Sequence, residues 1–327
     1  MSAHSPLWER IDEQGVRDVS IVGISKHAGK TTVLGRLIAD AGAEGRSLGV
    51  ASIGLDGERA DSLIGVPKPA ILVPEGTLFA TAIRVHRHDH APVRWLEPAS
   101  ISSPLGEVWI GQTLAEGTIE LAGVRQLAHL LALRKRFRQL GADHVLFDGA
   151  LARMIAVSPQ VADGVILASG AAVGGVAQVV RETVDAVRRL TVPLATSDVV
   201  AWANELHDPY GLFEKIGAEG QARVVYDGGA ITDASIGKWL GVAAPLLLIG
   251  RDPTCLFVSR EVWRAFLRAG HQLQVLARSP LLGVAINPVS PFGEILDRRM
   301  LLDTMKSKLT VPVWDVMDQE TADAMDG

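Results

Sequence analysis

The chain has 327 residues, of which 48 % are hydrophobic and 21 % are charged, a globular balance that argues against disorder. Its formal net charge of −5 gives no electrostatic reason to expect nucleic acid as a partner. The single cysteine, Cys255, excludes an intrachain disulfide and a cysteine-based zinc site, which suits a reducing cytosol. There is no run of about 18 apolar residues and no secretory signal pattern at the start. We therefore expect a cytoplasmic protein without a membrane span.

Residues 18–32 contain the motif around which the rest of the chain is interpreted. Val19 to Val22 is a short apolar run typical of a buried strand, and apolar residues recur at helical spacing from Thr31 onward. A strand, a glycine-containing loop and a helix that opens on Lys-Thr predict a phosphate-binding loop. The residues expected to contact the nucleotide there are Lys26, His27, Ala28, Gly29, Lys30, Thr31 and Thr32.

The chemistry expected of this loop follows from its backbone and two side chains. Backbone N–H groups and the positive end of the helix would face the phosphates, and Lys30 would add a full charge near the β- and γ-phosphates. Thr31 would place a hydroxyl where it can ligate Mg²⁺. The usual first glycine position holds Ile24, whereas Gly23 lies one residue earlier. The loop is therefore one residue longer or wound differently, unless the Gly-Lys-Thr-Thr match is accidental.

Two aspartates follow apolar strands and are candidates for the same site. Residues 48–55 predict a strand that ends at Asp56, which would hold Mg²⁺ or position the attacking water. Residues 144–148 predict another that ends at Asp148, which would ligate Mg²⁺. In each case the alternative is an ordinary turn aspartate before glycine. With Lys30, these aspartates form the predicted catalytic set.

Residues 62–122 fit a parallel sheet less well and predict a β-rich insertion before a long helix at 124–140. Within it, His86, His88 and His90 would share one face of an extended chain, as the ligands of some zinc sites do. An exposed polar turn is the simpler interpretation of the three histidines. Their role is left open.

The remainder alternates strands with helices, which predicts βαβ units and a mostly parallel sheet flanked by helices. The chain is thus expected to be an α/β protein with the fold of a P-loop NTPase. Asn287 ends an apolar strand and would face the adenine, although a turn-forming Asn-Pro is equally plausible. No Asn/Thr-Lys-x-Asp guanine-reading sequence occurs, which favours ATP over GTP. The predicted divisions are an N-terminal part of the core at 1–61, the insertion at 62–122, a continuation of the core at 123–200, and a C-terminal α/β part completing the nucleotide site at 201–327.

Several stretches that span nearly the whole chain carry a resemblance as an ordered set. They are residues 26–32, 52–58, 103–108, 119–123, 148–153, 156–159 with 166–171, and 287–291. In this order they resemble the ATPase subunit of the lysine 5,6-aminomutase reactivase family, which is related to the partitioning-ATPase and dethiobiotin-synthetase class of P-loop NTPases.

The resemblance implies an ATP- and Mg²⁺-dependent reactivating chaperone. Members of the family are thought to act with a second, mismatch-repair-protein-like subunit. Together they rescue an aminomutase that depends on adenosylcobalamin and pyridoxal phosphate and whose cobalamin is damaged. A homodimer is a possible assembly, and the client enzyme and any contact with cobalamin are not fixed by the sequence. The alternatives are an ATP-dependent small-molecule ligase of the dethiobiotin-synthetase type and, on the histidines alone, a nucleotide-dependent metallochaperone.

Overall fold

A computed structural model describes residues 5–53, 70–151, 154–216 and 223–317. The chain divides into two compact units. Unit 1 comprises Met1–Ala156, Gln160–Val184 and Leu281–Gly327, and unit 2 comprises Val157–Pro159 and Asp185–Pro280. Unit 2 is therefore almost entirely one continuous segment inserted into the sequence of unit 1.

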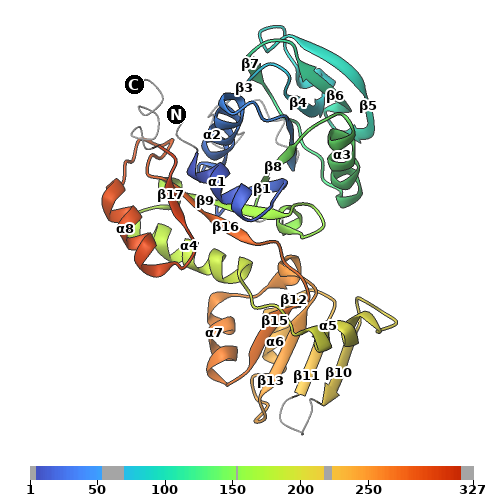
Figure 1. The fold of residues 1–327 in the computed structure, drawn as a ribbon. Helices are drawn as coiled ribbons and strands as arrows, with labels where there is room; N and C mark the ends of the chain where they lie inside the picture. Colours follow the sequence, from blue (N-terminus) through green and yellow to red (C-terminus); the bar gives the residue numbers. More distant parts are fainter. Residues whose placement is uncertain (1–4, 54–69, 152–153, 217–222, 318–327) are drawn as a thin grey trace. The chain divides into compact units, whose positions relative to one another are not determined.

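Unit 1 is built on a nine-stranded sheet (Figure 1). Seven neighbouring strands, from β17 to β4, run parallel, and β6 is antiparallel to both of its neighbours. The order across the sheet is β17 (Val313–Asp315), β16 (Leu281–Asn287), β9 (Gly164–Gly170), β1 (Asp18–Gly23), β8 (His144–Ala150), β2 (Leu48–Ile53), β4 (Leu78–Ala82), β6 (Gly106–Thr113) and β5 (Val93–Ser103). The predicted α/β class with a mostly parallel sheet is confirmed.

Helices cover both faces of this sheet, which is why β1, β2, β9 and β16 are buried at every position and consist mostly of apolar or small residues. On one face α1 (Pro6–Glu13) and α2 (Lys30–Ala43) share a core with Val19 and Ile21 of β1. On the other lie α3 (Leu127–Gln139) and α4 (Val176–Leu190). Phe137 of α3 packs on Gly49, and Thr183 of α4 lies 2.6 Å from Ser169 of β9, oxygen to oxygen.

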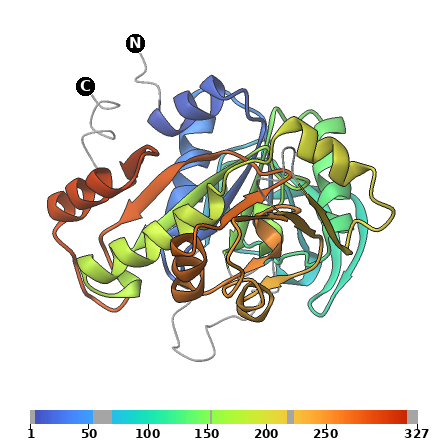
Figure 2. The same cartoon turned by 90° about the horizontal axis from the view of Figure 1, so that it is seen from below.

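The two margins of the sheet differ. At one margin β4, β6 and β5 extend the sheet within the predicted insertion, beside an antiparallel pair formed by β3 (Ile71–Val73) and β7 (Gly117–Ile119). At the other margin β17 lies beside α8 (Arg298–Lys308). Figure 2 shows α8, in red, at the side of unit 1 opposite to the cyan strands of the insertion.

Unit 2 has a sheet of its own. Its order is β10 (Leu212–Ile216), β11 (Arg223–Asp227), β13 (Leu246–Gly250) and β15 (Gln272–Val275), with only β10 antiparallel. A short parallel pair, β12 (Ile231–Thr232) and β14 (Leu256–Phe257), accompanies it. The helices are α5 (Ser197–Asn204), α6 (Asp233–Gly237) and α7 (Arg260–Arg268). Two clusters of buried apolar side chains form its core.

The boundaries of the two units differ from the domain boundaries predicted from the sequence. The predicted limit between 200 and 201 falls inside α5, whereas the chain divides between Val184 and Asp185, within α4. The sequence predicts that residues 201–327 complete the nucleotide site as one part. The structure instead assigns 201–280 to unit 2 and only the stretch from Leu281 onward to unit 1, because β16 pairs with β9.

Candidate functional site

The predicted phosphate-binding loop connects β1 to α2 at the carboxyl end of the parallel strands. Two residues of the loop have left-handed backbone conformations, His27 with φ 60° and Gly29 with φ 95°. Gly29 is the N-cap of α2, where the structure shows no side-chain capping bond, and the first turn contains no acidic residue. The first N–H groups of a helix lack partners within the helix, and the helix dipole is positive at this end. The loop therefore presents donors and positive potential suited to an anion.

Lys30 folds back over the end of β1. A Cβ atom added to Gly23 would lie 2.8 Å from Cγ and 3.1 Å from Cδ of Lys30, so the aliphatic stem of the lysine occupies the space that any other residue would fill. Ile24 continues the strand pattern, because its N–H donates to the carbonyl of Ala168 in β9 at 3.0 Å. These two contacts explain the unusual spacing of the phosphate-loop motif. Position 23 is glycine because it leaves room for the side chain of Lys30, and Ile24 is still hydrogen-bonded to the sheet through β9.

Asn287 lies behind the loop at the end of β16. A Cβ atom on Gly29 would lie 2.8 Å from its Cβ and 3.1 Å from its Nδ2. Its Oδ1 accepts a hydrogen bond from the N–H of Val289 at 3.0 Å, and its side chain is buried. Gly170 at the end of β9 fits between the carbonyls of Asn287 and Ala28. The structure thus brings Asn287 against the loop, and its predicted contact with adenine stays a prediction.

Asp148 is half-buried on β8, the strand next to β1. It is in register with Ile21 on one side and with Ser52 of β2 on the other. Residues in register on parallel strands share a face, and Ile21 faces the core shared with α2. The carboxylate is therefore on the face where α2 begins with Lys30. Asp56, the other predicted carboxylate, lies outside the described residues.

Ser52 is a feature of this face that the sequence does not single out. It is 2 % exposed and stands beside Asp148 in the ladder, so a hydroxyl lies next to the carboxylate in an otherwise apolar strand. The only signal in the sequence is a serine near the end of a buried strand. Among the loop residues Lys26 is exposed, Ala28 is buried, and Thr31 and Thr32 are half-buried.

An aromatic pair also lies at the loop. The ring of His27 meets that of Phe292 edge to face, with centroids 5.8 Å apart. Phe292 is 53 % exposed and belongs to the turn after β16, where Ser290 donates its N–H to the carbonyl of Glu294. The sequence offers a turn at Asn287-Pro288 as one interpretation, but it does not predict the contact between Phe292 and His27.

In the histidine cluster noted in the sequence, the rings of His86 and His90 lie against each other. His86 packs against Trp95, and its ring centroid is 5.2 Å from that of His90, whose Nδ1 accepts the N–H of Arg87. Burial lowers the pKa of His86, and the neighbouring His90 lowers it further. Within the described part of the chain, no three His, Cys, Asp or Glu side chains are grouped so that they could hold a metal ion.

None of the helices in the described ranges is both long enough and apolar enough to cross a membrane.

Comparison with known proteins gives little further guidance. No protein-family model matches the chain. No curated protein matches it either. Among solved structures it is similar to pNOB8 ParA bound to nonspecific DNA, with 12 % identity, a TM-score of 0.28, and coverage of 55 % of this chain and 62 % of that one.

It is also similar to the signal recognition particle receptor FtsY from Elizabethkingia anophelis, with 11 % identity and a TM-score of 0.29. That match covers 88 % of this chain and 65 % of FtsY, so the chain spans less than two thirds of either structure. Both TM-scores are low, and the site is therefore assigned from its own geometry.

Proposed function

We propose that this chain is a Mg²⁺-dependent ATPase. The observation that carries the proposal is the packing of Lys30 over Gly23 where the loop between β1 and α2 enters the helix. Asp148 on the adjacent strand, β8, lies on the face of the sheet that α2 covers. A cation held at the positive end of a helix suits a polyphosphate, and a carboxylate nearby suits its magnesium. Phosphoryl transfer requires mainly positioning and charge stabilisation, which such a site supplies.

Each residue has a distinct role in this proposal. Lys30 neutralises the β- and γ-phosphates, and the loop amides bind the phosphate oxygens. Thr31 and Asp148 hold Mg²⁺, the hard oxygen-ligating ion that their side chains suit. Bound Mg²⁺ would supply positive charge to the phosphates. Asp56 would position the attacking water, and Asn287 would face the adenine.

The finer proposal is that hydrolysis serves to reactivate a cobalamin-dependent aminomutase. Its support is the resemblance of the ordered sequence stretches to the lysine 5,6-aminomutase reactivase ATPases. The expected partners are a second, mismatch-repair-protein-like subunit and an aminomutase that uses adenosylcobalamin and pyridoxal phosphate. A ligase of the dethiobiotin-synthetase type is the alternative use of the same site.

The first experiment tests the nucleotide site. Phosphate release from ATP is measured for the unmodified chain, for Lys30→Ala and for Lys308→Ala, an exposed lysine on α8. Lys30→Ala should lose ATP turnover by about 100-fold or more, because a charge at the phosphates is removed. Lys308→Ala should retain it. Normal turnover by Lys30→Ala would show that the nucleotide site is assigned wrongly.

The second experiment separates the uses of the site. ATP hydrolysis is measured with and without an aminomutase holding inactivated cobalamin, together with the recovery of mutase activity. Acceleration and recovery that both require Lys30 would support the reactivase. If instead small carboxylated or aminated metabolites accelerate ADP formation and a ligated product appears, the chain is a ligase.

A further inference from the structure

β17 is an edge strand of the sheet in unit 1: it pairs with β16 on one side, and no strand of the described residues pairs with its other side, which is called the open margin below. Val284 of β16 donates its N–H to the carbonyl of Pro312 at 2.8 Å. Val316 donates its N–H to the carbonyl of Ile286 at 3.3 Å. In a parallel ladder, alternate residues turn both backbone groups toward the same neighbour. Within residues 312–316, the backbone polar groups of the even-numbered residues therefore point toward β16. The N–H and C=O groups of the odd-numbered residues, Val313 and Asp315, point toward the open margin.

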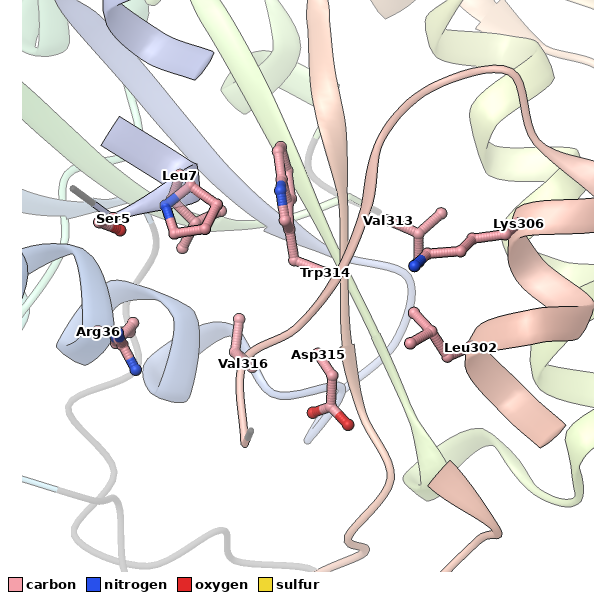
Figure 3. Close-up of a pocket in the computed structure, with 10 residues that line it drawn as sticks. Ser5, Leu7, Arg36, Leu302, Lys306, Val313, Trp314, Asp315 and Val316 are labelled. Carbon is pink, nitrogen blue, oxygen red and sulfur yellow. The ribbon is translucent and has the colours of Figure 1, made fainter. Parts of the chain in front are cut away.

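A cavity of about 210 Å³ runs along this open margin (Figure 3). Side chains of β17 and of Val316 just after it alternate across the cavity: Val313 points toward α8, whereas Trp314 and Val316 pack against the core shared with α1 and α2. Helices on both faces of the sheet, α1 and α2 on one and α8 on the other, line this cavity together with β17. We infer that these helices extend beyond the open margin of β17. The lining residues are Ser5, Pro6, Leu7, Arg36, Leu302, Lys306, Val313, Trp314, Asp315 and Val316.

The walls of this marginal groove combine apolar surface with positive charge. Leu7 of α1 and Leu302 of α8 line it from opposite sides of β17. Lys306 is exposed, and with the other described residues it makes no hydrogen bond or ion pair. Asp315, the acidic residue of the lining, is already held by Nε of Arg298 at 2.7 Å. Lys306 is therefore the cation that α8 contributes to the lining, and the other cation there, Arg36 of α2, is paired with Asp40 at 2.8 Å.

We propose that the marginal groove binds an extended, acidic peptide segment of a partner protein, which adds to β17 as a further strand. The outward N–H and C=O groups of Val313 and Asp315 would form the main-chain ladder, and the alternating walls would take alternate side chains. Lys306 favours acidic side chains on the α8 side.

A bare extended chain fits this margin better than a second copy of the protein. A second β17 would bring its own α1 and α8, which extend past the strand in the same way and would meet those of the first copy. The proposed peptide site lies at the β17 margin, whereas the nucleotide loop follows β1. It therefore does not depend on the proposed ATPase activity.

The test uses the full chain and a labelled peptide of about eight residues in which valine and glutamate alternate. Its affinity is measured by fluorescence anisotropy, beside a peptide with lysine in place of glutamate. Saturable binding is expected for the acidic peptide and not for the lysine peptide. Lys306→Glu should weaken it at least about fivefold, because attraction becomes repulsion. The matched control Lys308→Glu, on the same helix but outside the groove, should change it by less than about twofold.

A second readout separates strand addition from charge attraction alone. Bound peptide should slow hydrogen exchange at the amides of Val313 and Asp315, which face the open margin. N-methylation of alternate peptide amides should abolish binding in one register and be tolerated in the other, because only alternate N–H groups enter a ladder. Binding without this protection, equal effects of both methylated registers, or no saturable binding of the acidic peptide would each overturn the proposal.

Discussion

Gly23 determines how the lysine of the phosphate-binding loop is held. The stem of Lys30 lies where a side chain at position 23 would be, and the nearest atom to a Cβ there is Cγ of Lys30 at 2.8 Å. A contact this short forces the lysine to move, since real Cβ atoms do not approach other heavy atoms so closely. The course of the Lys30 stem thus depends on the absence of a side chain at the end of β1, the strand that leads into the loop.

Gly23→Ala should therefore raise the Kd for ATP about tenfold or more, a loss of roughly 1.4 kcal/mol, because the added methyl group displaces Lys30. The measurement is isothermal titration calorimetry with Mg²⁺ and ATP. Gly35→Ala is a matched control, because a Cβ on this glycine of α2 meets nothing within 4 Å. Its affinity for ATP should be unchanged. Equal affinities of the Gly23→Ala and unmodified chains would show that Lys30 does not depend on this packing.

At this scale the sequence predicts the loop but not its internal contacts. Gly29-Lys30 and the strand before it are visible in the sequence because their chemistry is local. The function of Gly23 is not visible, since it depends on where the side chain of Lys30 turns in space. Ser52 is missed for the same reason: it becomes relevant only through its register with Asp148. The predictions for Asp56, Asn287 and the Mg²⁺ ligands await experiment.

Among the secondary-structure elements, α1 is attached through three buried side chains, Leu7, Trp8 and Ile11, of which Trp8 makes the most varied contacts. Trp8 is fully buried and donates its indole N–H to the carbonyl of Leu37 in α2 at 2.9 Å. The guanidinium of Arg46 lies over the Trp8 ring, 4.5 Å from its centroid, and also binds Asp12 of α1 at 2.6 Å. His144, at the start of β8, meets the edge of the same ring at 4.8 Å. Three elements thus meet at one tryptophan.

This junction makes stability depend on pH. Burial, and next the charge of Arg46, lower the pKa of His144 below its ordinary value of 6.5. Below about pH 6.5 the unfolded chain takes up a proton that the folded chain resists, so the free energy of unfolding should fall as the pH decreases. Above that pH both states are neutral at this residue and it has no such effect. The slope due to His144 cannot exceed about 1.4 kcal/mol per pH unit.

Urea unfolding at pH 7.5 and pH 5.0 measures this effect. His144→Phe should reduce the loss of stability between the two pH values, because the replacement cannot be protonated. His88→Phe is the control at an exposed histidine and should leave the loss unchanged. A loss identical in the unmodified and His144→Phe chains would contradict the assignment.

Elements with strong hydrophobic patterns can be predicted, and those without them cannot. The central strands, such as β1 and β9, are buried on both faces and appear as continuous apolar runs. The sequence does not indicate β5, because this strand lies at the margin, is partly exposed along most of its length and contains Pro98. Nor does it indicate α1, a helix of only eight residues that is stabilised by the packing of buried side chains such as Trp8 and not by intrinsic helix propensity.

For the whole molecule, the two cores predict two unfolding steps. Unit 1 contains a large apolar cluster around α2 and the central strands together with further buried side chains such as Phe137 and Phe147, and unit 2 is held by clusters around its own sheet. If ATP binds only unit 1, Mg²⁺ with ATP at 100 times the Kd should stabilise that step by about 2.7 kcal/mol and leave the other unchanged. Guanidinium titrations followed by residue-level hydrogen exchange would resolve the steps. A shift of both steps, or the same shift in Lys30→Ala, would contradict this prediction.

The division into units cannot be predicted from the sequence, although the fold class can. Strands and helices alternate with the same pattern on both sides of residue 185, so periodicity does not show that the second set forms a separate sheet. The return to the first sheet at β16 depends on pairing between residues more than a hundred positions apart, for instance Asn287 with Gly170. Such long-range pairing cannot be recognised from the residues around either partner.

The late return of β16 has a consequence during synthesis on the ribosome. The loop that holds Lys30 emerges early, but Asn287, which supports Gly29 from behind, emerges only after all of unit 2. At about 5–20 residues per second, the roughly one hundred residues of unit 2 add about 5–20 s to the time between the emergence of β9 and that of β16. A nascent chain therefore exposes the unfinished margin of β9 throughout that interval, when chaperones would have to shield it.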